Sequence, residues 1–182
     1  CGVTQNMPGM AWQDAQGNWA GMDIDFCRAL AAAVLGDADT AKFVPLSARA
    51  RFSSLLSNEI DVLSRNTSTT LGRESQLGVL FTNPLFLTGQ AFLVHSNDAG
   101  KGILALSNAT IGVIKGTTHV QNLQEVAATQ HLQFTPVPYE NVDHAVRGFL
   151  AGECTVLTED ATTLAAIRLL LPSRSPAVSL LP

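Results

Sequence analysis

SRNTSTTLGR, residues 64–73, follows a short apolar segment at 60–63. The hydroxyl and amide side chains at 66–70 offer several hydrogen-bond donors in a row. Arg73 adds a planar guanidinium fork that can meet a carboxylate with two parallel hydrogen bonds. The stretch therefore suits the capture of a small carboxylate. A solvated polar loop with a surface arginine is the alternative that this stretch alone leaves open.

A second part of the chain has the same pattern. Residues 55–64 read LLSNEIDVLS and residues 149–158 read FLAGECTVLT, each with a helix end, a turn, a glutamate and a strand ending in Val-Leu. Polar residues leave both predicted strands, at 66–70 in the first and at 158–160 in the second. Because ligands of open α/β sheets bind beyond the carboxyl ends of strands, we expect two facing units with an arginine on one wall and a carboxylate on the other.

Composition limits the classes of function. The chain has 182 residues, 46% of them hydrophobic and 14% charged, which fits one domain or two small lobes with a sizeable core. Its 11 Lys and Arg residues are spread thinly and its net charge is -4, so we expect no nucleic-acid partner. Apolar runs are far shorter than the roughly 20 residues of a membrane span. No secretory signal is present, and we expect that one has been removed or trimmed.

The three cysteines leave two alternatives open. Cys27 falls in the first predicted helix and Cys1 in the strand beneath it, so a Cys1–Cys27 disulfide with Cys154 free is one alternative. Three buried thiols are the other. The chain has no CxxC motif, no His/Cys metal spacing and no GxxxxGK[ST] phosphate loop, so we expect neither a metal nor a cofactor.

The first half of the chain predicts a βαβαβ order. Strands are expected at 1–3, 42–45 and 60–63, which implies a parallel sheet covered on both faces. Asp23 is expected to cap the first helix and Gly36 to end it. Ser47 is expected to start the second helix, with Phe52, Leu55 and Leu56 turned inward. A loop at 5–19 carries Met and Trp side chains, among them Trp12, that could cover a ligand or simply pack at the surface.

The second half repeats this order. An extended crossing segment is expected at 90–94, strands at 110–114, 132–136, 154–157 and 177–181, and helices from Thr117 to Gln124, at 141–151 and at 161–171, the last capped by Asp160 and stopped by Pro172. Gly116, Thr117 and Thr118 open the first of these helices. Free N–H groups there can contact a carboxylate, while an ordinary threonine cap is the equal alternative.

Few residues predict enzymatic chemistry. The four histidines, at 95, 119, 131 and 144, stand in unrelated segments, and each is expected at the surface. No GxSxG elbow is present, and Glu59 and Glu153 occupy matching turns that look structural. We therefore expect that the protein is not an enzyme.

Four stretches carry a family resemblance: GNWAGMDIDFCRALAAAV at 17–34, LSARARFSSLLSNEIDVLSRNTSTTLGR at 46–73, GTT at 116–118 and LTEDAT at 157–162. In this order they resemble the polar-amino-acid class of periplasmic substrate-binding proteins of ABC transporters, and within it the general L-amino-acid-binding group. The resemblance covers essentially the whole chain. It implies an α/β fold of type II, a two-lobed clamp whose lobes are mainly parallel sheets with flanking helices.

The resemblance also implies boundaries, a location and a function. Lobe 1 would be 1–89, a hinge crossing 90–95, lobe 2 96–175, and 176–182 the start of a return crossing to an incomplete lobe 1. The clamp would be periplasmic, bind a free L-amino acid and present it to a membrane permease. Because a zwitterion bridging the lobes binds the closed state preferentially, ligand would shift an open–closed equilibrium.

Site residues follow from the matched motifs. The resemblance implies that Arg73 binds the ligand α-carboxylate and that Asp160 holds the α-ammonium group. The supporting residues are expected to be Ser68 and Thr70, the N–H groups near Thr117 and Thr118, and the flanking side chains of Asn66 and Trp12.

The chain departs from the family at three points. Thr69 stands where an aromatic is usual, which bears on side-chain selectivity, and Gly112 stands where a cysteine is usual, which would leave Cys154 without a partner. The family's C-terminal segment is missing, so we expect exposed apolar surface on lobe 1 and, as a result, either self-association or marginal stability. Two rivals share the scaffold: a periplasmic cyclohexadienyl or arogenate dehydratase, with Glu159 as its only candidate acid, and a sensory ligand-binding module.

Overall fold

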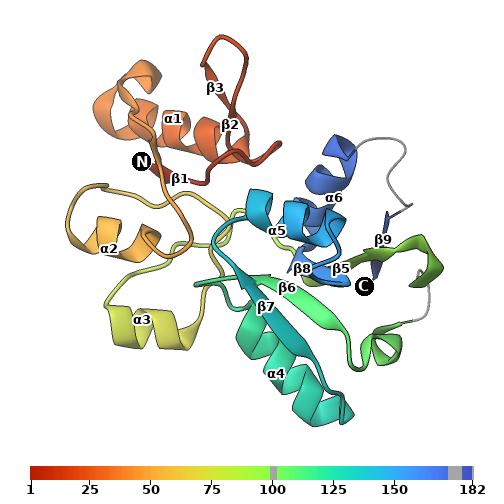
Figure 1. Ribbon diagram of the computed structural model, residues 1–182. Helices are drawn as coiled ribbons and strands as arrows, with labels where there is room; N and C mark the ends of the chain where they lie inside the picture. Colours follow the sequence, from red (N-terminus) through yellow and green to blue (C-terminus); the bar gives the residue numbers. More distant parts are fainter. Residues whose placement is uncertain (99–101, 172–177, 182) are drawn as a thin grey trace. The chain divides into compact units, whose positions relative to one another are not determined.

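The computed structural model describes residues 1–98, 102–171 and 178–181 (Figure 1). It divides into two compact units, Cys1–Phe86 and Leu87–Pro182. Among the residues described, no helix combines the length and the apolar character needed to cross a membrane. The division does not test the roles assigned to 90–95 and 176–182, so the predicted lobe boundaries stay a prediction.

The first unit follows the predicted βαβαβ order only in part, because the expected strand at 60–63 is reduced to one bridge. Strand β1 (Gly2–Val3) pairs in parallel with β4 (Val44–Pro45), and Gly2 also forms a parallel bridge with Leu63. The helices are α1 (Met22–Leu35), α2 (Arg51–Leu56) and α3 (Leu71–Leu77). The loop before α1 contains a small antiparallel hairpin of β2 (Trp12–Gln13) and β3 (Trp19–Ala20), and one 3-10 turn (Ala38–Thr40) follows α1.

Local signals in the first unit were partly misassigned. Gly36 ends α1 in the left-handed conformation as predicted, but Gly21 rather than Asp23 is the N-cap, and Asp23 is buried in the first turn. Helix α2 begins at Arg51, not at Ser47, whose Oγ accepts a hydrogen bond from Ala50 N–H at 3.1 Å instead. Its buried face carries Arg51 and Ser54, whereas Leu56 is exposed. Phe52 and Leu55 are half-buried, and the Arg51 guanidinium carbon lies 4.9 Å from the centroid of the Phe52 ring.

The second unit is built on one five-stranded sheet with the order β7-β6-β8-β5-β9. The strands are β5 (Gln90–His95), β6 (Thr110–Ile114), β7 (Thr135–Tyr139), β8 (Val156–Asp160) and β9 (Val178–Leu181). Strand β6 pairs in parallel with β7 and β8, while β5 runs antiparallel to both of its neighbours. The sheet is therefore mixed, with a parallel part formed by β7, β6 and β8.

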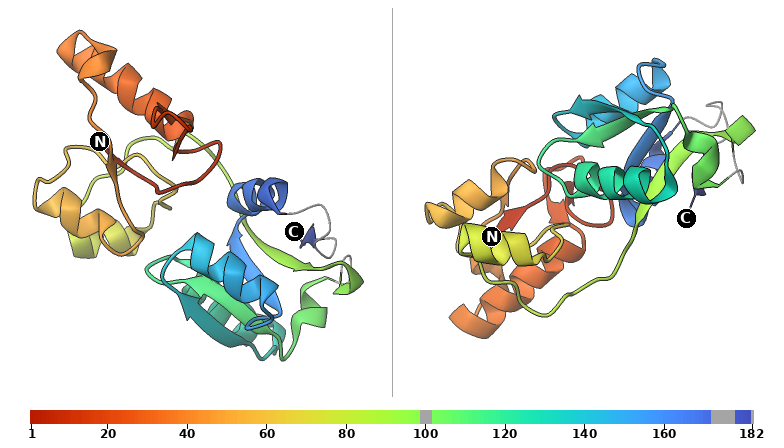
Figure 2. Two further views of the ribbon diagram at one scale, coloured as in Figure 1. Left: turned by 45° about the horizontal axis from the view of Figure 1, so that its top comes forward. Right: turned by 90° about the horizontal axis from the view of Figure 1, so that it is seen from below.

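Helices cover both faces of this sheet (Figure 2). Helix α4 (His119–Gln130) lies on one face, and α5 (Val142–Leu150) and α6 (Ala161–Leu170) lie on the other, as right-handed crossovers between parallel strands require. Two short 3-10 segments (Ser96–Asp98 and Ile103–Leu106) follow β5. The predicted strands at 132–136 and 154–157 begin two to three residues later than expected, and the predicted stop at Pro172 lies outside the described residues.

Each unit has its own core. In the first, Val3, Ala11 and Ile24 pack with Cys27, which forms a disulfide with Cys1; Cys154 is free and buried. Of the two alternatives left by the sequence, the structure has the disulfide. In the second unit, buried side chains of β5, β6 and β8 pack with Leu123 of α4 and Leu106. These cores hold the strand ends from which the candidate site residues project.

Candidate functional site

Arg73 projects from α3 in the first unit. Its Nη1 donates to the Ser68 backbone oxygen at 2.6 Å, and its guanidinium carbon lies 5.3 Å from the centroid of the Phe52 ring. Partial burial lowers the pKa of the guanidinium, because the charged form loses solvation. Phe52 and the Ser68 carbonyl thus hold the Arg73 head against residues 66–70, the stretch predicted to receive a carboxylate.

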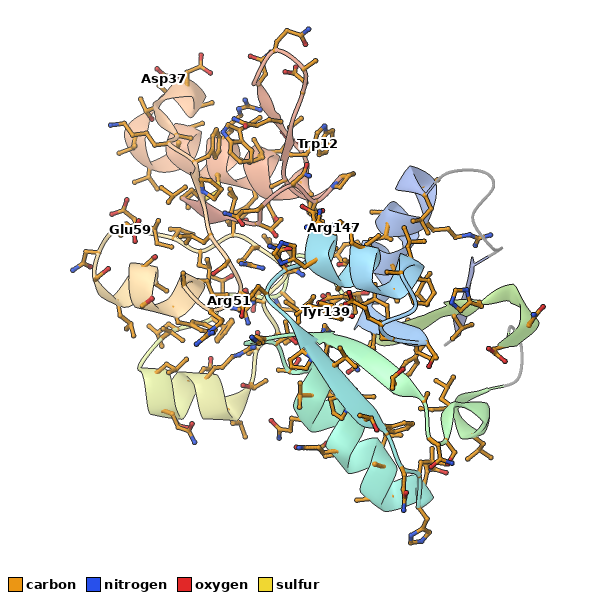
Figure 3. The ribbon with its side chains drawn as sticks, viewed as in Figure 1. Trp12, Asp37, Arg51, Glu59, Tyr139 and Arg147 are labelled. Carbon is orange, nitrogen blue, oxygen red and sulfur yellow. A yellow bond between two sulfur atoms is a disulfide. The ribbon has the colours of Figure 1, made fainter. Side chains whose placement is uncertain are left out.

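The polar residues before α3 already have local partners. Thr70 is the N-cap of α3, and its Oγ1 accepts a hydrogen bond from Arg73 N–H at 3.2 Å. Ser68 is exposed, while Asn66 is half-buried and its Oδ1 accepts from Arg65 Nη2 at 3.2 Å. Thr70 therefore has a structural role whether or not it also contacts a ligand. Trp12 stands half-buried on the β2–β3 hairpin (Figure 3).

Asp160 stands at the carboxyl end of β8 in the second unit. It is the N-cap residue of α6, but its carboxylate makes no capping hydrogen bond, contrary to the prediction. Its Oδ1 lies 3.4 Å from His119 Nε2, and its side chain is 16% exposed. The neighbouring Glu159 is buried, and its Oε2 accepts a hydrogen bond from Asp160 N–H at 3.2 Å.

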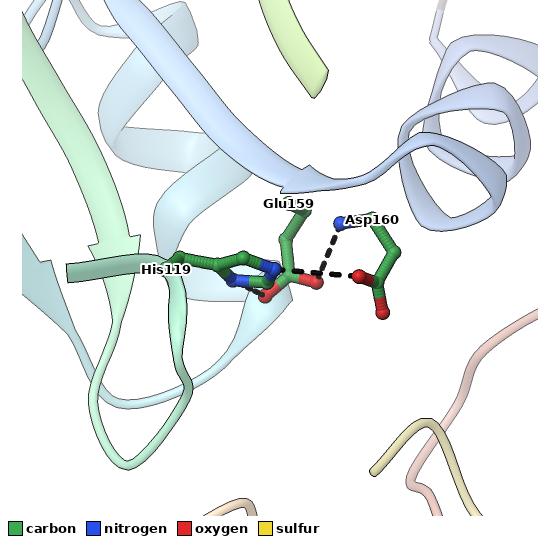
Figure 4. Close-up of side chains that lie close together, drawn as sticks. All are labelled: His119, Glu159 and Asp160. Atoms are coloured by element: carbon green, nitrogen blue, oxygen red, sulfur yellow. Dashed lines mark hydrogen bonds and ion pairs between the residues drawn. The ribbon is translucent and has the colours of Figure 1, made fainter. Parts of the chain in front are cut away.

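His119 lies between these two carboxylates (Figure 4). Its Nδ1 is 3.4 Å from Glu159 Oε1, and its Nε2 faces Asp160. Burial opposes the charged ring, but the Asp160 carboxylate, which accepts a hydrogen bond from the ring, and the negative charges of both Asp160 and Glu159 outweigh it and raise the pKa of His119 to about 9. The imidazole therefore carries a positive charge at neutral pH.

The prediction that His119 lies at the surface is wrong. It is the first residue of α4, where the loop after β6 brings it beside the end of β8, the neighbouring parallel strand. The signal that could have identified it was its position directly after Gly-Thr-Thr, because the carboxyl ends of adjacent parallel strands meet at one edge of a sheet. Only the pairing of β6 with β8 shows which carboxylates it meets.

The composition of this cluster would suit a metal, since its three potential ligand atoms lie within 4.8 Å of one another. Each ring nitrogen of His119 lies 3.4 Å from an oxygen of a different carboxylate. The contacts therefore fit an imidazolium between two carboxylates.

The threonines before α4 are partly engaged. Thr117 uses both its hydroxyl and its N–H to contact the Ile114 carbonyl oxygen, at 2.8 Å and 3.4 Å. Thr118 is the N-cap of α4 without a side-chain capping bond. Gly116 between strand and helix has φ 82°, a left-handed conformation that favours glycine. The Thr117 N–H is thus occupied locally, contrary to the expectation that it is free.

Comparisons with known proteins agree on one family. The sequence profile described as "Bacterial extracellular solute-binding proteins, family 3" matches residues 1–167. The chain is 44% identical over 171 residues to the "General L-amino acid-binding periplasmic protein AapJ" of Rhizobium johnstonii, covering 94% of this chain and 50% of that protein. It is 37% identical over 180 residues to the "Glutamate/glutamine/aspartate/asparagine-binding protein BztA" of Rhodobacter capsulatus, covering 99% and 53%. The chain spans about half the length of these curated relatives.

Solved structures share the fold. An ABC transporter periplasmic binding protein from Brucella ovis with glutathione bound is 36% identical, with a TM-score of 0.92 over 100% of this chain and 57% of that one. An ancestral arginine-binding protein bound to arginine is 26% identical, with a TM-score of 0.83 over 99% and 76%. The fold is thus that of a type II periplasmic binding protein, and the relatives named here are binding proteins rather than enzymes.

Proposed function

The chain belongs to family 3 of the bacterial extracellular solute-binding proteins, and we propose that it binds free L-amino acids in the periplasm and delivers them to the permease of an ABC transporter. The observation that carries this proposal is the half-buried Asp160 carboxylate at the end of β8, beside a charged histidine. It is a suitable acceptor for an ammonium group, and similarity to amino-acid-binding relatives supports that use.

Arg73 is proposed as the partner of the ligand α-carboxylate. Its guanidinium is held by Ser68 and Phe52, which reduces the entropy lost when a carboxylate binds. Ser68, Thr70, Thr118 and the N–H groups at the start of α4 would supply further hydrogen bonds, and Asn66 and Trp12 would flank the ligand. Affinities of micromolar to nanomolar correspond to about 8 to 12 kcal/mol.

Isothermal titration tests the amino-acid proposal. The chain is unfolded and refolded to remove bound ligand, then titrated with common L-amino acids and with glutathione. The best ligand is compared with its N-acetyl and carboxamide derivatives, which each remove one of the two proposed charge contacts. We expect saturable binding of the parent ligand and a loss of about 100-fold or more for either derivative. Equal binding of a derivative would refute the matching contact.

Delivery to a permease requires a separate test. Transport of the best ligand into vesicles holding a candidate permease is measured with and without this chain. We expect ATP-dependent uptake only when the chain is present.

We also propose self-association through apolar side chains of the first unit. Val34, Leu71 and Leu80 are 71%, 85% and 95% exposed. Exposed apolar surface favours association. Multi-angle light scattering over a range of concentrations is expected to show a dimer, and a monomer at all concentrations would contradict this.

A further inference from the structure

We propose that His119 is a positioning residue that sets the net charge at the ammonium end of the site. The site would then accept ligands with one cationic group near the α-carbon and discriminate against ligands with two. This inference rests on the proposed function, because it takes Asp160 as the contact of the ligand ammonium group.

The contacts of the ring identify its role. Nδ1 and Nε2 each lie 3.4 Å from a carboxylate oxygen, one of Glu159 and one of Asp160. A neutral imidazole has one N–H and one lone pair, so one nitrogen would set its lone pair against a carboxylate oxygen. An imidazolium carries a proton on both nitrogens, so Nε2 donates to Asp160 while Nδ1, which has no hydrogen-bond partner among the described residues, lies within ion-pair distance of Glu159. The position of the ring between Glu159 and Asp160 therefore matches the charged form.

Neutral groups fix the backbone of His119. Gln90 of β5 donates from Nε2 to Thr158 Oγ1 at 2.9 Å and to the His119 carbonyl oxygen at 3.4 Å. Asn122 of α4 donates to Gln90 Oε1 at 2.8 Å. This network joins the start of α4 to β5 and β8 without adding charge. The helix N-terminus itself opposes a cation, so within the described part of the chain Glu159 and Asp160 are the charges that compensate His119.

Of the three side chains in this cluster, only that of Asp160 is exposed enough for a ligand to touch it. The side chain of Asp160 is 16% exposed, against 6% for His119 and 3% for Glu159. With His119 charged, the two carboxylates and the imidazolium leave one net negative charge, which a single ammonium group balances. Without the imidazolium, two negative charges would stand at one place, and a second ligand cation would become favourable.

Two isosteric ligands measure this discrimination. L-Homoserine has one cationic group, and L-2,4-diaminobutyrate replaces its hydroxyl by a second ammonium group. Their dissociation constants are measured by competition with the best ligand of the panel, for the parent and for His119→Gln. We expect the parent to prefer homoserine, and His119→Gln to move the ratio by about tenfold or more toward diaminobutyrate.

A double variant distinguishes charge from packing. Glu159→Gln leaves the cluster without net charge and is expected to weaken homoserine binding by about tenfold or more. His119→Gln combined with Glu159→Gln restores one negative charge, so binding is expected to return to within about threefold of the parent. If the single variants act only by loss of packing, the double variant would bind homoserine more weakly than either of them. His144→Gln, at an exposed position of α5, is the matched control. It is expected to change neither the affinity for homoserine nor the preference for homoserine over diaminobutyrate.

The protonation of the ring is tested directly by 15N NMR of histidine-labelled protein at pH 7. Two protonated ring nitrogens are expected for His119, and a neutral ring would overturn the inference even if a variant fails to fold. A folded His119→Gln with an unchanged ligand ratio would overturn it as well. If the parent binds no amino acid, the proposed function fails and the inference fails with it, whereas binding with an unchanged ratio refutes the inference alone.

Discussion

Residues 55–66 of the first unit and 149–160 of the second match position for position, and their turns are the same. Glu59 N–H donates to the Ser54 oxygen at 3.0 Å, and Glu153 N–H donates to the Gly148 oxygen at 2.9 Å. Both turns pass through a left-handed residue, Asn58 with φ 58° and Gly152 with φ 78°. The local sequence therefore produces the same helix end in both units.

The segments after these turns differ. Residues 156–160 form β8, which pairs with β6 on one side and β5 on the other. The matching stretch in the first unit has only the bridge between Leu63 and Gly2. Equal local patterns thus give a full strand only where neighbouring strands are present on both sides, because strand stability comes from pairing.

The charges at the two strand ends are reversed. Arg65 and Asn66 of the first unit match Glu159 and Asp160 of the second. Each is balanced at the start of a helix: the Arg65 charge acts on buried Asp23 of α1, and Glu159 faces His119 of α4. The same local pattern thus ends in a cationic residue in one unit and in two anionic residues in the other.

The largest expected effect separates the matching residues Asp160 and Asn66. Asp160→Ala should weaken amino-acid binding by about 3 kcal/mol or more, because a buried ligand charge loses its partner. Asn66→Ala should cost only about 1 kcal/mol, since it removes a neutral contact. Isothermal titration of both variants decides this, and an Asp160→Ala protein that binds like the parent would mean that the site is wrongly assigned.

A second disulfide would make the two units more alike. A Cβ atom on Gly112 would lie 2.9 Å from Cys154 Sγ, so the cysteine of a Gly112→Cys variant is expected to form a disulfide with Cys154. The expected gain in free energy of unfolding is about 2 to 4 kcal/mol, partly offset by crowding from Tyr139. Burial raises the pKa of the Cys154 thiol, so oxidation should be carried out at alkaline pH. Thiol titration and urea unfolding measure the result, with the reduced variant as control.

The balancing groups predict losses of stability with rising pH in two different pH windows. The pKa of His119 is raised from 6.5 to about 9, so its stabilisation is complete below pH 6.5 and is lost as pH rises through 9. The difference in free energy of unfolding between the parent and His119→Gln should therefore shrink by about 2 to 3 kcal/mol across this window. Urea titrations at pH 6, 7.5 and 9.5 measure it, and a constant difference would count against the charged ring.

Asp23 should lose its contribution to stability in the same direction, but at lower pH. Burial raises its pKa from 3.8 to about 6, although the Arg65 charge and a hydrogen bond from Ser64 act against this. The folded state holds this proton more tightly, so the contribution of Asp23 to stability falls as pH rises from about 4 to 6. The free energy of unfolding of Asp23→Asn, relative to that of the parent, should therefore rise by about 1 to 3 kcal/mol over that range. Paired unfolding curves at pH 4 and 7 test this, with the exposed Asp37→Asn as control.

The smallest effect concerns the shared turn. Gly152→Ala places a Cβ atom on a residue with φ 78° and should lower the free energy of unfolding by about 1 kcal/mol. Asn58→Gly removes a Cβ atom and should change it by only a few tenths of a kcal/mol. Thermal unfolding of both variants checks whether the two turns are equivalent. A larger loss in Asn58→Gly than in Gly152→Ala would show that the Asn58 side chain does more than tolerate the turn.

The sequence by itself determined the features that depend on neighbours along the chain. Strand β6 matches its predicted range, Gly36 ends α1, and the paired turns appear where the repeated pattern predicted them. Each of these depends on backbone hydrogen bonds and φ preferences within a few residues, which a local pattern can encode. The choice of Arg73 and Asp160 as opposite charges came from the same repeat and remains a prediction for binding.

Only the tertiary structure decided which charged groups meet. His119 comes beside Glu159 and Asp160 because β6 pairs with β8, and Asp23 is buried because α1 packs on β1 rather than exposing its first turn. The reversed direction of β5 likewise depends on strands distant in sequence. Such contacts arise from strand pairing and burial between segments far apart in the sequence, so a local sequence pattern does not contain them. The same contacts set the pKa values of His119 and Asp23.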